Sequence, residues 1–414
     1  MPARGLLLAL FVSVIALGVL GAQRPAVGED RLPSCPGNGL TLADLGEQAL
    51  EKLPWDAKIV RANLSAERPV AIAACYLMEQ DLLVITREGL VYCMSRRDLT
   101  PRWVSSLKSQ LKAVPSEGPL HYAFLTKAPD GAYWVQAFRK RSGAEETGFP
   151  TRLPFATSSG VTNNGSRIWI GSLGSPLNNR TIESLNLVNG RPSWGWRTRG
   201  LLWASPVIDP SGNSLVVAGE DGTVMSLNAG MEAPSEPNWT VKMTGAVTAT
   251  PVVTPGHVVV GAHDGTVRCI DLGSGETLWF HGLDSPLKHS PWVHGRMGTV
   301  TRSTGVEGAP EVQVKAYTGI AFVRNRDTLF AFDLAAGQEL FKDANARRPV
   351  CLHGNWVTTL DDHKRLVFRD ASEDYAVKGK LDLSMFDLIP SNATDGTVFG
   401  CTHDGGLVVA TPTP

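Results

Sequence analysis

A short unit that recurs along the chain constrains its fold more than any other feature. The fullest copy, Gly256–Trp279, has two apolar segments on either side of Asp264-Gly265, then a second turn at 273–275 and a segment that carries Trp279. Asp-Gly between two β-rich segments is a strong hairpin signal, because both central turn residues need a positive φ. One unit therefore predicts a meander of about four strands.

The unit recurs at a nearly constant spacing. Eight copies align on the first residue of the central turn, which is Glu88, Asp130, Asn179, Asp221, Asp264, Arg326, His363 and Asp404. A period of about 40–50 residues with four strands in each repeat is typical of β-propeller blades. We therefore expect an all-β chain in which residues 57–414 form one propeller of eight blades. Seven is the alternative if the weaker Asp130 copy is not a blade.

The two ends of the repeat array complement each other. The last copy has its hairpin but stops at Pro414, before the strand that would complete the blade. A strand-like segment, Lys58–Leu64, precedes the first complete copy. A closed ring leaves only short, protected strand edges. We predict that this N-terminal strand pairs with the C-terminal strand and closes the ring.

Composition supports this fold and narrows the classes of partner. The 42 Gly and 27 Pro residues argue against long helices, because both residue types are unfavourable in helix interiors. Lys and Arg number 39 against 40 Asp and Glu, so the net charge is −1. Nucleic-acid binding needs a basic stripe, and we expect none here.

The N-terminal segment has a different character. Arg4 is followed by an apolar run over residues 5–22 that ends in small residues, a pattern typical of a secretory signal peptide. The run also just reaches the length of a membrane span, so residues 1–22 are a cleaved signal or an uncleaved anchor. Residues 23–56 read as a linker with a short helix at Leu42–Leu53. We expect a periplasmic or extracellular protein that contacts a membrane, if at all, only through an uncleaved segment at residues 5–22.

The repeat resembles the PQQ-like, or quinoprotein-type, propeller family. The shared pattern is an apolar strand, Asp-Gly, a second strand, Asp-x-x-x-Gly and then Trp. The resemblance implies that these Trp and Gly residues dock neighbouring blades on one another. The matching positions are Trp103, Trp194, Trp239, Trp279, Gly190, Gly275 and Gly337. Phe341 departs from the pattern, and the copy that ends at Asp370 has no aromatic residue at the matching position.

The family contains both enzymes and scaffolds. Its dehydrogenases bind PQQ and Ca²⁺ and often use a disulfide between adjacent cysteines, and this chain has no Cys-Cys pair. In size and make-up the chain is more similar to BamB-like scaffold propellers, which hold no cofactor, although no Cys ends its apolar run. We therefore expect a non-catalytic binding platform without cofactor or metal. A PQQ-dependent and Ca²⁺-dependent oxidoreductase is the alternative, and a sensor of a small ligand remains open.

The His and Cys residues form no recognisable catalytic or metal-binding motif. The His-Asp-Gly triplets at 263–265 and 403–405 occupy the same turn in two repeats, where Asp-Gly is required by geometry. Cys93 and Cys269 occupy the same strand position in two repeats, as small core residues would. We expect mostly buried thiols, with a bridge between the first and last blades, Cys75 to Cys401, as the alternative.

One irregular segment is the best candidate for a binding site. The 62-residue spacing between Asp264 and Arg326 carries an insertion at about residues 295–319. Long loops on rigid scaffolds often carry binding residues, and aromatic and Arg side chains are favoured at interface hot spots. The candidates are Trp292, His294, Arg296 and Arg302. The partner would be a protein or another envelope polymer, and a solvent loop without function is the alternative.

Overall fold

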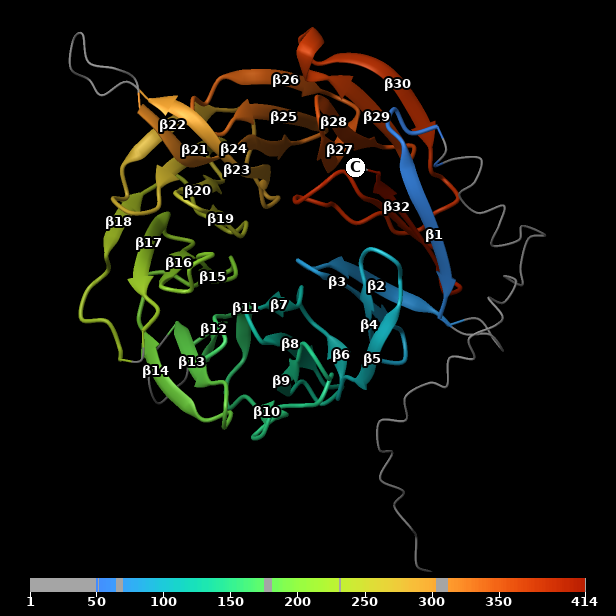
Figure 1. Cartoon of the computed structure of the whole chain (residues 1–414). Helices are drawn as coiled ribbons and strands as arrows, with labels where there is room; N and C mark the ends of the chain where they lie inside the picture. The colour runs from blue at the N-terminus through green and yellow to red at the C-terminus, as the bar shows by residue number, and fades with distance from the viewer. Residues whose placement is uncertain are drawn as a thin grey trace, which may run out of the picture.

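The described part of the chain is an eight-bladed β-propeller. The computed structural model describes residues 50–413, except 51, 65–69, 175–180, 231 and 303–311. Within these residues, eight antiparallel sheets surround a central axis (Figure 1). The Asp130 copy forms a blade of its own, which confirms the prediction of eight blades rather than seven.

The first four blades follow in chain order. Blade 1 consists of β2 (Ile72–Leu77), β3 (Asp81–Thr86), β4 (Leu90–Ser95) and β5 (Pro101–Ser106); blade 2 of β6 (Gln110–Leu111), β7 (Ser116–Glu117), β8 (His121–Lys127), β9 (Tyr133–Arg139) and β10 (Thr151–Arg152); blade 3 of β11 (Thr157–Asn163), β12 (Arg167–Ser172), β13 (Ile182–Asn186) and β14 (Pro192–Trp196); blade 4 of β15 (Val207–Ile208), β16 (Ser214–Ala218), β17 (Thr223–Asn228) and β18 (Trp239–Lys242).

The other four blades complete the ring. Blade 5 consists of β19 (Val252–Thr254), β20 (His257–Gly261), β21 (Thr266–Asp271) and β22 (Thr277–Gly282); blade 6 of β23 (Trp292–Arg302), β24 (Val312–Asn325), β25 (Thr328–Asp333) and β26 (Glu339–Asp343); blade 7 of β27 (Ala346–His353), β28 (Trp356–Asp361), β29 (Arg365–Asp370), the 3₁₀ turn η1 (Ala371–Glu373) and β30 (Ala376–Asp382); blade 8 of β31 (Val398–Cys401), β32 (Gly406–Pro412) and β1 (Ala57–Asn63).

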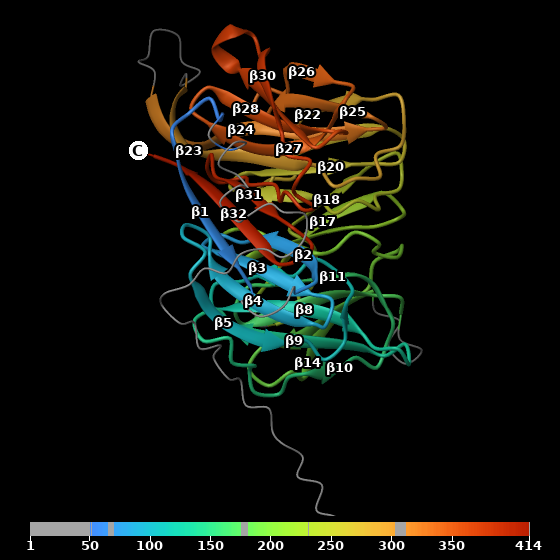
Figure 2. The ribbon, with the colours of Figure 1, turned by 90° about the vertical axis from the view of Figure 1, so that its right-hand side faces the viewer.

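Blade 8 closes the ring as the sequence predicted. β1 pairs antiparallel with β32 in an unbroken register from Ala57↔Pro412 to Asn63↔Gly406, and the two strands lie side by side in Figure 2. The strand nearest the axis is reduced in this blade to a single bridge, Leu388↔Cys401. Blade 8 is therefore built from both ends of the described chain.

The core is divided among the interfaces between blades. Middle strands such as β3 and β12 are buried along their whole length, because each blade is covered on both faces by its neighbours. The described apolar residues form eight clusters, and each cluster joins two adjacent blades. We call each interface between two adjacent blades a seam. The stability of the ring therefore depends on every seam.

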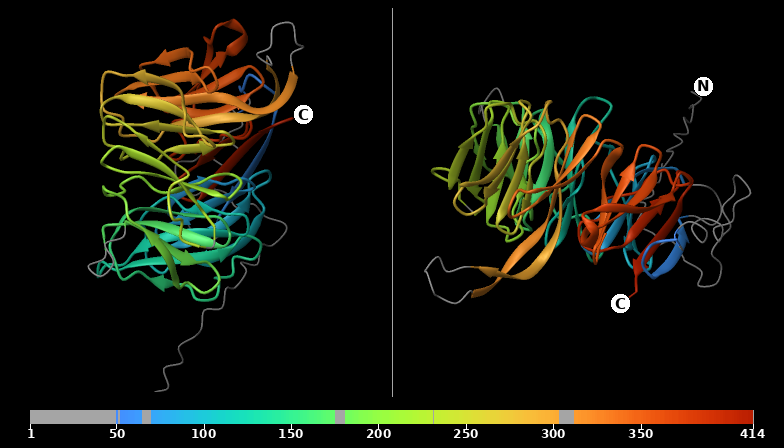
Figure 3. Two further views of the ribbon diagram at one scale, coloured as in Figure 1. Left: turned by 90° about the vertical axis from the view of Figure 1, so that its left-hand side faces the viewer. Right: turned by 90° about the horizontal axis from the view of Figure 1, so that it is seen from above.

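The insertion in blade 6 is a hairpin and not the long loop that the sequence suggested. β23 and β24 pair continuously from Trp292↔Phe322 to Arg302↔Val312. Only residues 320–325 of β24 also pair with β25. The rest of the hairpin projects from one face of the ring (Figure 3), and we call residues 295–302 and 312–319 the arm. The extra residues lengthen two existing strands, because a hairpin satisfies backbone hydrogen bonds that a loop would leave to solvent.

The segment before the ring is only partly described. Residues 1–22 and most of 23–56 lie outside the described residues, so the predicted signal or anchor and most of the predicted helix are not placed. Leu50 and Leu53 are described and are buried in the cluster between blades 7 and 8. Among the described residues, no helix is long and apolar enough to span a membrane.

Candidate functional site

The base of the arm is shaped by a pair of glycines. Gly295 on β23 faces Gly319 on β24. A Cβ on Gly319 would lie 2.3 Å from the His294 carbonyl oxygen, and one on Gly295 would lie 2.3 Å from that of Thr318. Glycine within a strand often marks such close backbone approach. The pair therefore lets the two strands come together where the arm leaves the ring.

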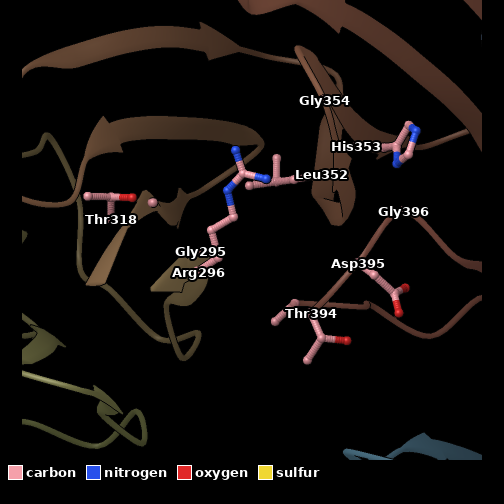
Figure 4. A pocket seen from close by; sticks show the side chains of 11 residues that line it. Gly295, Arg296, Thr318, Leu352, His353, Gly354, Thr394, Asp395 and Gly396 are labelled. Atoms are coloured by element: carbon pink, nitrogen blue, oxygen red, sulfur yellow. The ribbon is translucent and has the colours of Figure 1, made fainter. Parts of the chain in front are cut away.

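A cavity of about 310 Å³ lies beside this base (Figure 4). One wall is the arm, with Arg296 and Thr318. The other walls are the turn between β27 and β28, which includes His353, and the 393–396 loop before β31, which includes Asp395. Blades 6, 7 and 8 thus each contribute a wall on the face from which the arm projects.

The two charged side chains that line the cavity, Asp395 and Arg296, differ in their interactions with the rest of the protein. In Figure 4 the Asp395 carboxylate points away from Arg296; it is paired with Arg96 at 3.2 Å and accepts a hydrogen bond from Asn392. Burial raises the pKa of Asp395, but hydrogen bonds from Thr397 and Asn392 outweigh it and hold the pKa below its usual range. Arg296 is exposed and has no hydrogen-bond partner among the described residues. Its guanidinium is therefore the cavity charge that is available to a ligand.

His294 lies in the core and not on the surface of the arm. It is 1% exposed, its Nε2 lies 3.2 Å from Ser391 Oγ, and its ring packs edge-on against Phe322. Ser391 Oγ donates to the Pro349 carbonyl, so Nε2 of His294 carries the proton that Ser391 accepts. Burial lowers the pKa of His294 to about 3. The imidazole is therefore neutral at physiological pH and joins blade 6 to blades 7 and 8.

The other three candidate residues are spread along β23. Trp292 is half-buried and packs against the cluster between blades 6 and 7. Arg296 lines the cavity, and the backbone of Arg302 pairs with Val312 at the last described step of the hairpin. The side chain of Arg302 lies outside the described residues, and of the other three candidates Arg296 is the one whose side chain lies at an open binding surface.

The predicted docking residues lie at the seams. Trp279 of blade 5 donates from Nε1 to the Leu334 carbonyl of blade 6 at 2.8 Å and covers Gly337, where a Cβ would meet its ring at 2.5 Å. Trp239 makes the same contacts with Leu272 and Gly275. The matching donors Trp103 and Trp194 bond to Lys140 and Gly230 of the next blade, while Gly190 lies against Thr151 and Gly148.

Sequence reasoning missed the part of the site that lies outside the arm. The 391–397 segment is a run of small and polar residues that reads as an ordinary turn. Asn392, whose amide donates to Asp395 and to the Thr397 carbonyl, organises this loop. Within the described part of the chain, no three His, Cys, Asp or Glu side chains are arranged to hold a metal ion. The cavity at the base of the arm therefore offers a ligand the guanidinium of Arg296.

Comparison with known proteins shows which repeats those of this chain resemble. A family model described as outer membrane protein assembly factor BamB matches residues 195–339. The Yersinia pestis protein of that name is 24% identical over 289 residues, 66% of this chain and 67% of the relative. The one from Moranella endobia is 22% identical over 253 residues, which cover 60% of each chain. The chain thus spans about 60 to 67% of the length of these relatives.

Solved structures show the same fold. The crystal structure of BamB from Moraxella catarrhalis has a TM-score of 0.57 at 15% identity and covers 85% of this chain and 98% of that chain. A computationally designed protein, Ika8, has a TM-score of 0.53 at 15% identity and covers 83% of this chain and 97% of its own. The ring, its repeats and these matches agree. The chain is a β-propeller whose repeats resemble those of the PQQ-like family and of BamB.

Proposed function

We propose that the chain is an exported, non-catalytic scaffold that holds a protein partner during the assembly of outer membrane proteins. The observation that carries this proposal is the arm with its cavity, which adds a projecting binding surface to a rigid ring. The relatives named as outer membrane protein assembly factors support the process. The apolar run at residues 5–22 supports export. A periplasmic location, with or without an anchor at that run, follows from the same proposal.

The arm and the cavity suggest how the partner is held. Arg296 offers an unpaired guanidinium at the cavity, and Met297 beside it is 55% exposed. A guanidinium binds a carboxylate through two parallel hydrogen bonds, and a Met side chain adapts to varied apolar surfaces. We therefore expect the partner to present an acidic side chain next to an apolar one.

The scaffold role is tested by complementation in the organism that encodes the chain. Deleting the gene should reduce the amount of folded outer membrane β-barrel proteins, measured as heat-modifiable bands on gels, and the full chain should restore it. A variant in which an Asn-Gly turn replaces residues 296–318 should fold but fail to restore it. The matched control replaces Pro255-Gly256, the turn between β19 and β20, with Asn-Gly and should be fully active.

The outcomes separate the two parts of the proposal. Unchanged barrel assembly after gene deletion would refute the scaffold role itself. Restoration by the shortened arm would keep that role but remove the arm from it. Arg296→Glu should weaken restoration more than Arg296→Lys, and Arg97→Glu, an exposed arginine in the turn between β4 and β5, should have no effect.

A further inference from the structure

The seam between blades 8 and 1 is where the two ends of the ring meet. Backbone hydrogen bonds join them, from Ile72 N to the His403 carbonyl at 3.0 Å and from Val70 N to the Asp404 carbonyl at 3.1 Å. An apolar cluster with residues from both blades, including Leu82 and Val409, fills the seam. Any opening of the ring at its closure must separate these groups.

Two cysteine thiols face each other across this seam. Cys75 lies on β2 of blade 1, and Cys401 ends β31 of blade 8. Their Sγ atoms are 3.1 Å apart, and both are thiols in the structure. The two residues are 326 positions apart in the sequence, so the fold alone brings them together. A disulfide bond is about 2.05 Å long, which leaves the sulfur atoms about 1 Å from bonding distance.

The other described cysteines have no such partner. Cys93, Cys269 and Cys351 are fully buried thiols in three different blades. Cys269 Sγ donates to the Leu334 carbonyl, and burial raises the pKa of Cys351 to about 12. Since thiolates are the reactive form, these three serve as internal controls of the same residue type in the same chain.

We infer that Cys75 and Cys401 form a disulfide that locks the ring at its closure. The oxidant is a small or protein disulfide, written RSSR. The half-buried Cys75 thiolate attacks one sulfur of RSSR, forms Cys75–S–SR and releases RSH. Cys401 loses its proton and attacks Cys75 Sγ, which forms the Cys75–Cys401 bond and releases the second RSH. Two protein thiols are oxidised and one RSSR is reduced to two RSH, so atoms and electrons balance.

The lock has a direct effect on stability. A cross-link across a loop of this length removes much of the conformational freedom of the unfolded chain. The hydrogen bond with Cys401, together with burial, raises the pKa of the Cys75 thiol. Thiol–disulfide exchange at Cys75 is therefore slow in the folded state. The Cys75–Cys401 disulfide forms most readily while the chain folds in an oxidising compartment.

The test uses the purified full-length chain, unfolded and refolded in buffers of increasing glutathione disulfide. Thiols are then alkylated under denaturing conditions and read by peptide mass spectrometry. We expect Cys75 and Cys401 to lose alkylation together and to appear as one cross-linked peptide pair. The melting temperature of the oxidised chain should exceed that of the reduced chain by about 5 °C.

Variants test whether the effect belongs to this pair. Cys75→Ser and Cys401→Ser should each abolish the cross-link and remove the difference in melting temperature between oxidised and reduced chains. Cys93→Ser should leave both intact, and a Cys35→Ser background excludes pairing with Cys35. The inference is overturned if Cys75 and Cys401 stay alkylated while the chain refolds. Glutathione retained on Cys75, or oxidation spread evenly over the cysteines, would also overturn it.

Discussion

Two kinds of seam hold this ring together. At the seam between blades 1 and 2 and at the seams from blade 3 to blade 6, an aromatic side chain of one blade packs on the loop of the next, as Trp279 does on Gly337. At the closure between blades 8 and 1, the same strand position holds Val60. Val60 pairs with Val409, the fifth residue after Asp404, just as Trp279 pairs with Cys269, the fifth after Asp264.

The difference shows that the repeat pattern does not stabilise the ring evenly. Val60 is half-buried and donates no side-chain hydrogen bond, whereas the Trp279 indole is 8% exposed and bonds to the next blade. At the closure, the backbone hydrogen bonds from Val70 and Ile72 to the 403–404 turn and the facing Cys75 and Cys401 thiols take the place of an aromatic contact. We expect the docked seams to be the more sensitive to single substitutions.

The largest effect should come from removing a docking indole. Trp279→Ala leaves a cavity between blades 5 and 6 and removes the indole hydrogen bond to the Leu334 carbonyl, so the free energy of unfolding should fall by about 3–5 kcal/mol. Chemical denaturation measures the change. The control is Phe280→Ala, because Phe280 follows in the same strand but is 67% exposed, and it should cost less than about 0.5 kcal/mol. Equal losses in the two variants would contradict the docking role.

The second prediction separates contact from backbone strain. Gly337 has φ +73°, and a Cβ there would lie 2.5 Å from Trp279 Cγ, whereas Gly256 has φ +86° and open space around it. Gly337→Ala should cost about 3 kcal/mol, from the left-handed backbone and from overpacking. Gly256→Ala should cost only about 1 kcal/mol. Denaturation of both variants measures the difference, and similar losses would show that the indole can move aside.

The repeated turns made most of the ring predictable from sequence. Hairpin turns are local, so residues such as Asp264 and Gly265 predict each blade independently of the blades beside it. The missing strand after Asp404 likewise pointed to β1. The arm was not predictable in this way. Arg296 pairs with Thr318, and these two residues are separated by a long insertion rather than by a short local turn.

The candidate site was less predictable than the ring. Its walls come from Arg296, His353 and Asp395, which are far apart in the sequence and carry no motif. His294 was a candidate because it lies beside the insertion with Trp292 and Arg296, yet its ring packs on Phe322 inside the core. A sequence gives residue types at a position, whereas burial at that position is decided by neighbouring blades.

A third prediction concerns the loop that receives Trp103 at the seam between blades 1 and 2. In that loop, Glu146 accepts two hydrogen bonds from Arg139 and one from His121. The Arg139 guanidinium, opposed by burial and aided by His121, lowers the pKa of Glu146 to about 2. The ionised Glu146 therefore contributes to the free energy of unfolding. This contribution is fully present above the ordinary carboxyl pKa and is lost as the pH falls towards 2.

Glu146→Gln isolates this contribution. At pH 7 the variant should be less stable than the parent by about 2 kcal/mol, and the difference should shrink towards zero near pH 2. Denaturation at a series of pH values measures it. Glu276→Gln, at an exposed position in the turn between β21 and β22, should show no such window. A difference between Glu146→Gln and the parent that stays constant with pH would show that packing, and not charge, is responsible.

The smallest expected effect lies at the closure itself. Val60→Ala removes half-buried methyl groups from the cluster between blades 8 and 1 and should cost about 1 kcal/mol, well below the loss for Trp279→Ala. Lys58→Ala, at an exposed position two residues earlier in β1, should cost less still. Both are measured in the reduced chain, because a Cys75–Cys401 bond would hold the seam independently of Val60. A loss for Val60→Ala as large as that for Trp279→Ala would mean that the closure depends on apolar docking just as the other seams do, and the contrast between the two kinds of seam would then be wrong.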